Sequence, residues 1–330
     1  MSKALALVSG GLDSLLAARV IMEQGIEVMG VCFVMSFASR DIEGFKQNVH
    51  KNACSAKIPL KIFDISEEFL RILENPRHGY GANLNPCIDC KILMLTHAKA
   101  MMAALKADFI VTGEVLGERP MSQRRDALNT ITKGADLAGY LLRPLSAKVL
   151  DPTIPEQEGM VDRSRLHDIT GRGRSRQFEL AEKYGITKYF TPAGGCLLTD
   201  PGFTRRMKDL MRHGGLDPDA VKLLKHGRHF RIDAGTRVVV GRDEADNEDI
   251  LSTGKEMDVI VRLKEIAGPY VLLRGNTSIS NIKKAASLCV SHSKSKNMAS
   301  EKCEYWTAEG NERDLEAAPM IRTEIEKYRI

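Results

Sequence analysis

Six residues near the start of the chain constrain the fold more than any other stretch. They follow an apolar run, residues 4–8, that predicts a buried strand, and they precede residues 15–22, which predict a helix. Backbone N–H groups at a helix start lack intrahelical partners, and the helix dipole adds roughly half a positive charge there. Glycines let the main chain approach a bound phosphate closely. The stretch therefore predicts a phosphate-binding turn, formed by Ser9, Gly10, Gly11, Leu12, Asp13 and Ser14.

The alternative is an ordinary glycine-rich turn between a strand and a helix. The pattern is not a Walker loop, because no Gly-Lys-Ser/Thr closes it. The order Ser-Gly-Gly-Leu-Asp-Ser directly after a strand is nevertheless much more specific than two adjacent glycines. We therefore favour the phosphate-binding interpretation, with the hydroxyls of Ser9 and Ser14 as additional donors.

Strand-like and helix-like segments alternate through residues 1–190. Further strands are expected at residues 26–34, 60–65, 109–114 and 141–145, with helices at 42–56 and 98–105. Such alternation is typical of an α/β fold with a doubly wound parallel sheet covered on both faces. Ligands bind such sheets beyond the carboxyl ends of the strands. Cys32, Phe33 and Gly113 lie at expected strand ends, so we expect them beside the phosphate-binding turn.

The character of the chain changes near residue 200. We expect a basic helix at 203–212, a second short helix at 219–226 and strands at 229–232, 236–240, 258–263 and 270–273. Helices are expected at 243–252 and 279–290, and the last residues, 303–330, predict a strand and a closing helix. The sequence thus predicts two domains, residues 1–200 and a smaller α+β domain at 201–330.

The composition excludes some classes of protein. The chain has 330 residues, and no apolar run reaches the roughly 18 residues that a membrane span needs. Because no signal peptide is recognisable either, we expect a cytoplasmic protein without a membrane partner. The net charge of +5 leans weakly toward polyanions. The oligomeric state is not determined by the sequence.

Cysteines form the second informative pattern. Cys87 and Cys90 follow Pro86 in a Cys-x-x-Cys arrangement, so their thiols lie close enough to share a metal or exchange a disulfide. Cys196 follows a Gly-Gly pair that lets a side chain reach a site. Three thiols suit an iron–sulfur cluster with one open iron, or persulfide chemistry with Cys196 as nucleophile. A structural zinc needs a fourth ligand, for which only His78 and Cys54 are candidates.

These motifs resemble a known family. Residues 9–14, residues 111–123 and Leu142-Arg143-Pro144-Leu145 are similar to the PP-loop domain of tRNA sulfurtransferases of the 4-thiouridine synthetase type. The resemblance implies ATP-dependent tRNA thiolation, in which a uridine carbonyl is adenylated with release of pyrophosphate and sulfur is then inserted. It implies ATP and Mg2+ as cofactors, with Asp13 as a catalytic residue and Arg143 as a phosphate contact.

The cysteine trio looks like the three-cysteine arrangement of cluster-dependent tRNA thiolases. Cys87, Cys90 and Cys196 would then be catalytic residues and the ligands of a 4Fe-4S cluster. The sulfur donor would be inorganic sulfide or a cysteine desulfurase. A persulfide route without a cluster stays open, as does an amine-transferring PP-loop enzyme of the lysidine or deazapurine type. Sulfur removal from thiolated bases, and a nucleotide-gated RNA-binding protein, are further alternatives.

RNA contact is expected from two parts of the chain. Residues 226–275 are similar to an NFACT-R-like domain, a type associated with RNA. Arginine suits bidentate phosphate contact, and five arginines with two glycines lie within fourteen residues. The alternative is a solvated loop with local ion pairs. The predicted RNA-binding residues are Arg163, Arg165, Arg172, Arg174 and Arg176, with tRNA as the partner.

Overall fold

The computed structural model describes residues 2–37, 39, 41–190, 196–307, 310 and 312–330. The chain divides into two compact units, Met1–Thr199 and Asp200–Ile330, which we describe separately. In the described part of the chain, no helix is both long and apolar enough to cross a membrane.

The first unit is built on a parallel sheet of five strands in the order β3-β2-β1-β4-β5. The predicted α/β fold with a doubly wound parallel sheet is thereby confirmed. The strands are short and strongly apolar, as expected for a sheet buried on both faces. Their bounds are β1 Lys3–Leu7, β2 Glu27–Val34, β3 Leu60–Asp64, β4 Phe109–Thr112 and β5 Leu141–Leu142.

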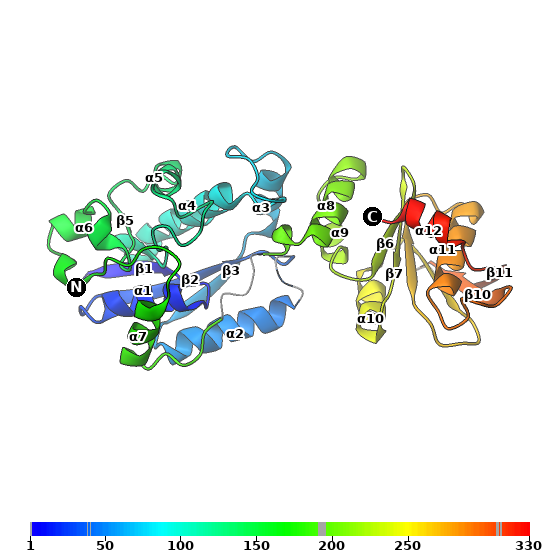
Figure 1. The fold of residues 1–330 in the computed structure, drawn as a ribbon, viewed down its shortest axis with the longest axis horizontal. Helices are drawn as coiled ribbons and strands as arrows, with labels where there is room; N and C mark the ends of the chain where they lie inside the picture. The colour runs from blue at the N-terminus through cyan, green and yellow to red at the C-terminus, as the bar shows by residue number, and fades with distance from the viewer. Residues whose placement is uncertain (1, 38, 40, 191–195, 308–309, 311) are drawn as a thin grey trace. The chain divides into compact units, whose positions relative to one another are not determined.

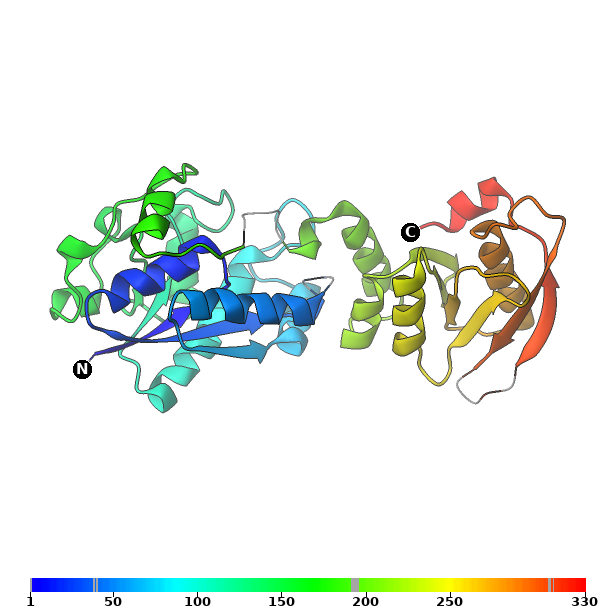
Figure 2. The ribbon, with the colours of Figure 1, turned by 90° about the horizontal axis from the view of Figure 1, so that it is seen from below.

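Helices cover both faces of this sheet (Figures 1 and 2). Alternate residues of β1 show why: Ala4 and Ala6 pack toward α1 and α7, whereas Leu5 packs toward α4 and α5. The helices are α1 Leu12–Met22, α2 Ile42–Ser55, α3 Ser66–Glu74, α4 Cys87–Leu105, α5 Arg125–Gly134, α6 Ile154–Gln157 and α7 Ser175–Lys183. Three single 3-10 turns, Ala147–Val149, Arg163–Arg165 and Leu197–Thr199, complete the unit.

The strand order places a topological switch point between β1 and β4. After β1 the chain crosses to β2 on one side, whereas β4 pairs with β1 on the other side. Connections that leave two neighbouring strands in opposite directions open a crevice beyond their carboxyl ends. The Ser9–Ser14 turn and Gly113 follow these two strands, so the fold brings them to that crevice as the sequence predicts.

The second unit is a six-stranded antiparallel sheet in the order β11-β10-β8-β9-β7-β6. Its strands are β6 Arg228–Asp233, β7 Thr236–Val240, β8 Val259–Leu263, β9 Val271–Arg274, β10 Glu301–Trp306 and β11 Arg313–Ala317. The helices are α8 Pro201–His213, α9 Pro218–Leu223, α10 Glu244–Thr253, α11 Ile279–Ser291 and α12 Arg322–Tyr328. α11 packs on one face, while Leu223 of α9 and Ile250 of α10 pack on the other.

The elements differ from the sequence predictions in several places. α4 begins at Cys87, directly after Pro86, and extends the predicted segment 98–105 toward the N-terminus. The C-terminal residues form two paired strands, β10 and β11, where the sequence predicted one. The sequence analysis predicted no helix at α3, α5, α6 or α7.

Candidate active site

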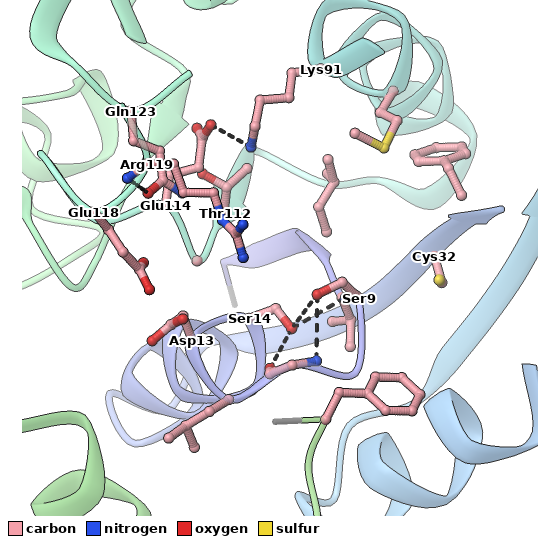
Figure 3. Close-up of a pocket in the computed structure, with 18 of the residues that line it drawn as sticks. Ser9, Asp13, Ser14, Cys32, Lys91, Thr112, Glu114, Glu118, Arg119 and Gln123 are labelled. Carbon is pink, nitrogen blue, oxygen red and sulfur yellow. Dashed lines mark hydrogen bonds and ion pairs between the residues drawn. The ribbon is translucent and has the colours of Figure 1, made fainter. Parts of the chain in front are cut away.

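A pocket of about 350 Å³ opens at the carboxyl ends of β1, β2 and β4 (Figure 3). Its volume lies at the lower end of the range of small-molecule sites. The predicted nucleotide-binding residues that line it are Ser9, Gly11, Asp13, Ser14, Cys32, Phe33 and Gly113. The structure therefore brings together residues from three strand ends that are far apart in the sequence.

The turn after β1 is held by hydroxyl bonds within itself. Ser14 Oγ donates to the carbonyl oxygen of Gly11 at 2.8 Å and accepts from the N–H of Ser9 at 3.2 Å. Gly11 precedes the first turn of α1 and provides no side-chain cap, so the N–H groups of that turn are left for a ligand. Figure 3 shows the side chains of Ser9 and Ser14 next to each other at this turn.

Gly10 does not line the pocket but fixes the path of the turn. Its φ is +77°, a value that side chains disfavour, and an added Cβ would lie 2.8 Å from the ring of Phe190. Phe190 donates its N–H to the Gly10 carbonyl oxygen at 3.0 Å and stacks on Phe45 with ring centroids 5.2 Å apart. Phe190 thereby becomes an aromatic wall of the pocket.

Apolar side chains form the part of the pocket away from the turn. Cys32 and Phe33 of β2 lie there with Met94 and Leu95 of α4. Burial raises the pKa of the Cys32 thiol to about 12, so this thiol is protonated at neutral pH and serves as an apolar surface. This surface suits the flat, apolar faces of a nucleobase.

Glu114 carries a fully buried carboxylate at the end of β4. Lys91 Nζ lies 2.7 Å from Oε1 and Arg143 Nε lies 2.9 Å from Oε2. Burial alone would raise the pKa of Glu114, but these two cations outweigh it and lower the pKa to about 2. Arg143 does not line the pocket, because its guanidinium is directed to Glu114, the Leu128 carbonyl oxygen and Thr132.

Asp13 in the first turn of α1 is paired with Arg174. The Arg174 NH2 group lies 3.2 Å from both carboxylate oxygens of Asp13, and NH1 donates to Glu118 Oε1 at 2.8 Å. Burial raises the pKa of Asp13 and of Glu118, and Arg174 opposes the rise in both. The pocket thus contains a carboxylate–guanidinium–carboxylate bridge in which Arg174, predicted from the sequence to bind RNA, takes part.

The other four arginines of the predicted RNA-binding stretch lie outside the pocket. Arg163 pairs with Glu156, and Arg165 donates to the Glu23 carbonyl oxygen at 2.7 Å. Arg176 pairs with Asp168, and Arg172 is exposed. Their role in RNA binding stays a prediction.

The three cysteines of interest approach one another. Leu84 donates its N–H to the Leu198 carbonyl oxygen at 3.3 Å, and the Asn83 side chain donates to Thr199 O at 2.8 Å. These bonds join the segment just after Cys196 to the segment just before Cys87. The Gly-Gly pair at residues 194–195 lies outside the described residues.

The electrostatics of the thiols agree with this proximity. Burial, together with the nearby thiolates of Cys196 and Cys87, raises the pKa of Cys90 to about 12. Burial also raises the pKa of Cys196, with Cys87 contributing. All three side chains are partly buried, and the amide of Asn85 donates to Cys87 Sγ at 3.3 Å. Cys90 is followed directly by Lys91, which lines the pocket.

No three His, Cys, Asp or Glu side chains of the described residues are placed to hold a single metal ion. His78 pairs with Asp89 at 2.9 Å, and Cys54 contacts His50 on α2. Neither joins the three thiols, so the zinc alternative gains no support. A 4Fe-4S cluster binds each thiolate at a different iron, so its thiolates lie farther apart than the ligands of a single metal ion. Three thiols close enough to interact electrostatically fit that donor set.

Several pocket residues were not predicted as site residues. Lys91 and Phe190 reach the pocket through contacts between distant parts of the chain, which no local pattern reveals, whereas Glu114 follows Gly113 at an expected strand end. Glu118, Arg119 and Gln123 fall within residues 111–123, whose similarity to the sulfurtransferases was the one available signal.

Comparison with known proteins assigns both units to families. Residues 1–150 match the family model described as thiamine biosynthesis protein (ThiI). Over residues 1–150 the first unit is similar to a ThiI-type PP-loop domain. Residues 227–329 match the NFACT protein RNA binding domain, which lies within the second unit. The resemblance stated from the sequence, a sulfurtransferase PP-loop domain followed by an NFACT-R-like domain, is confirmed.

Individual relatives match part of this chain. It is 31% identical over 147 residues to a probable tRNA sulfurtransferase of Thermococcus kodakarensis, covering 43% of this chain and 36% of that protein. It is 26% identical over 229 residues to the tRNA-specific 2-thiouridylase MnmA of Symbiobacterium thermophilum, covering 63% and 55%. The chain thus spans about a third to a half of these curated relatives.

Among solved structures, the chain is similar to the U34-tRNA thiolase NcsA from Methanococcus maripaludis with its [4Fe-4S] cluster. The identity is 16%, the match covers 68% of this chain and 70% of that chain, and the TM-score is 0.36.

Proposed function

We propose that this protein is an ATP-dependent tRNA sulfurtransferase. The observation that carries the proposal is the position of Cys90, which directly precedes the pocket residue Lys91 and lies near Cys87 and Cys196. A phosphate-binding turn and a group of thiols thus meet at one end of the parallel sheet. The ThiI family match of residues 1–150 supports the same activity.

The first step is activation of a uridine carbonyl. The carbonyl oxygen attacks the α-phosphate of ATP, and pyrophosphate leaves. The uncapped N–H groups of α1 and the hydroxyls of Ser9 and Ser14 stabilise the charge that develops on the phosphate oxygens. Asp13 lies in the first turn of α1, where its carboxylate would hold Mg2+, which would neutralise charge on the phosphates. Sulfur then attacks the activated carbon, and AMP leaves.

Two sulfur chemistries suit the thiols. A 4Fe-4S cluster bound by Cys87, Cys90 and Cys196 would leave one iron free of protein thiolate and open to the sulfur that is transferred. Alternatively, Cys196 carries a persulfide that attacks the uridine, and Cys87 or Cys90 completes the transfer by forming a disulfide that a reductant reopens. Inorganic sulfide serves the first chemistry, and a cysteine desulfurase serves the second.

The second unit and exposed arginines of the first unit support an RNA partner. The NFACT protein RNA binding domain matches residues 227–329, and Arg165, Arg172 and Arg176 are exposed on the first unit. Guanidinium groups contact phosphates of the RNA backbone, so such a surface binds tRNA without reading its sequence. The thiols favour sulfur over an amine as the incoming nucleophile, since amine transfer has no use for them.

The test combines nucleoside analysis with pyrophosphate release. Mass spectrometry of tRNA nucleosides from a deletion strain should show the loss of one thiolated uridine, which the purified protein restores with ATP and a sulfur source. Pyrophosphate release should depend on the unmodified tRNA. Intact thiolated nucleosides together with tRNA-independent ATP turnover would contradict the proposal. Full activity of Cys87→Ala would instead favour amine transfer.

A further inference from the structure

Arg174 occupies an unusual place for a residue in a basic surface stretch. It lines the pocket, its side chain is 16% exposed, and its guanidinium bridges Asp13 and Glu118. Its Nε atom is buried and has no hydrogen-bond partner among the described residues. The guanidinium is thus placed at the phosphate-binding turn with part of its hydrogen-bonding capacity unused.

The backbone around Arg174 is fixed rather than free to drift. Gly171 donates its N–H to the Leu116 carbonyl oxygen at 2.7 Å, and Leu116 pairs with Thr170 in a parallel bridge. Ser146 Oγ donates to the Ile169 carbonyl oxygen at 2.6 Å and accepts from the Leu116 N–H. The segment before Arg174 is therefore bound to the residues that follow β4. This places the side chain of Arg174 at the pocket, beside the N-terminus of α1.

Among the described residues three cations line the pocket, and they are not equivalent: Arg119 is exposed, whereas Lys91 and Arg174 are partly buried. Lys91 is paired with the fully buried Glu114, whose other oxygen is held by Arg143. Arg174 instead holds Asp13 and Glu118, two carboxylates that burial makes costly to keep charged. The two 3.2 Å contacts of Arg174 to Asp13 are long for charge-assisted hydrogen bonds, and an arriving triphosphate brings charge and oxygen acceptors that suit a planar guanidinium.

We propose that Arg174 is a phosphate-binding catalytic residue of the nucleotide pocket, and that its bridge to Asp13 and Glu118 is the arrangement of the nucleotide-free protein. On ATP binding the guanidinium moves from Asp13 to the phosphates, and Asp13 is released to face the cation that accompanies them. The inference rests on the proposed ATP-dependent function. It separates Arg174 from its four neighbours in the arginine stretch, which lie outside the pocket.

The test measures nucleotide binding to the full chain without RNA. Titration calorimetry of Mg-ATP should give an affinity about ten- to a hundredfold weaker for Arg174→Ala, as expected when charge-assisted hydrogen bonds are lost. Arg174→Lys, which keeps the charge but not the planar fork, should fall between Arg174→Ala and the wild type. Adenosine has no phosphate, so its affinity should change less than about twofold, which also shows that the variant pocket is folded.

A matched control is Arg124→Ala, because Arg124 is an exposed arginine of the same unit that pairs only with Asp126 at 3.5 Å among the described contacts. Its Mg-ATP affinity should equal that of the wild type. Wild-type affinity of Arg174→Ala for Mg-ATP would overturn the inference while leaving the proposed function intact. An equal loss of Mg-ATP and adenosine binding would also overturn it. A wild-type protein that binds no ATP would contradict the proposed function itself.

Discussion

Gly113 and Asp13 approach each other through their backbones. A Cβ built on Gly113 would lie 2.5 Å from the carbonyl carbon of Asp13 and 2.5 Å from the N of Ser14. The end of β4 therefore touches the first turn of α1 with no room for a side chain. This contact sets the width of the crevice at the switch point, because both segments carry pocket residues.

Gly113→Ala should impair nucleotide binding more than it impairs folding. The added methyl group meets backbone rather than a flexible side chain, so the first turn of α1 must shift away from β4. Mg-ATP affinity should fall by about tenfold or more, measured by calorimetry, since a small misplacement of the phosphate site is costly. Gly173→Ala is the control, because an added Cβ there meets nothing within 4 Å. Equal affinities of the two variants would contradict this account.

Glu114→Gln should destabilise the first unit. Glutamine keeps the shape but leaves Lys91 and Arg143 without their buried anion, and breaking such a pair costs about 3–5 kcal/mol. Thermal unfolding followed by circular dichroism should show a lower midpoint for Glu114→Gln than for Glu179→Gln, which changes an exposed residue of α7. Because the folded-state pKa of Glu114 is about 2, the stabilisation is present above pH 4.5 and disappears as the pH falls through about 2. Equal unfolding midpoints for the two variants would contradict a stabilising role of the Glu114 ion pairs.

The sequence predicted the parts of the site that are local in the chain. The strand, the Ser9–Ser14 turn and the helix are contiguous, and parallel strands necessarily bring their carboxyl ends to one edge. Cys32, Phe33 and Gly113 were therefore placed correctly at the pocket from strand ends alone.

Charged partners could not be predicted, because their pairing is set by tertiary contacts. Arg174 reaches Asp13 across 161 positions of sequence, so the sequence analysis assigned it to an RNA-binding stretch and not to the pocket. Arg143 follows a strand and was expected at the phosphates, yet it turns toward Glu114, 29 positions away. The composition indicates that buried charged side chains need partners of opposite charge, but only the tertiary structure determines which side chains form each ion pair.

The second unit should lose stability at mildly acidic pH through His229. This side chain on β6 is 3% exposed and donates Nε2–H to the His226 carbonyl oxygen at 2.7 Å. Burial, with help from Arg237 and Arg206, lowers its pKa well below 6.5. Below pH 6.5 His229 is protonated in the unfolded chain but stays neutral in the folded chain. The free energy of unfolding of the second unit therefore decreases as the pH is lowered, by at most about 1.4 kcal/mol per pH unit for one such group.

Trp306 offers a direct measurement, because it is the single tryptophan of the chain and lies in β10 of the second unit. Urea unfolding followed by its fluorescence should give a steeper pH dependence between pH 6.5 and 5 for the wild type than for His229→Gln. His226 and His292, whose pKa values are also lowered, account for the dependence that remains in the variant. Identical slopes for both proteins would exclude His229 as the cause.

The thiol trio should determine the iron content of the protein. Anaerobically reconstituted wild-type protein should hold about four iron atoms per chain and absorb broadly near ~400 nm, as thiolate-bound clusters do. Cys87→Ser, Cys90→Ser and Cys196→Ser should each lose most of this iron. Cys54→Ser should retain it, because Cys54 is an exposed thiol on α2 that contacts His50 instead. Trio variants with the iron content of the wild type would rule out these ligands.

Wild-type protein without iron after reconstitution would instead favour the persulfide chemistry. Alkylation followed by peptide mass spectrometry should then detect one extra sulfur on Cys196 after incubation with a cysteine desulfurase. The Cys196 persulfide should accumulate in whichever of Cys87→Ser and Cys90→Ser lacks the thiol that reacts with it. Its accumulation in one of the two variants identifies the partner thiol, which the proximity of all three side chains leaves open.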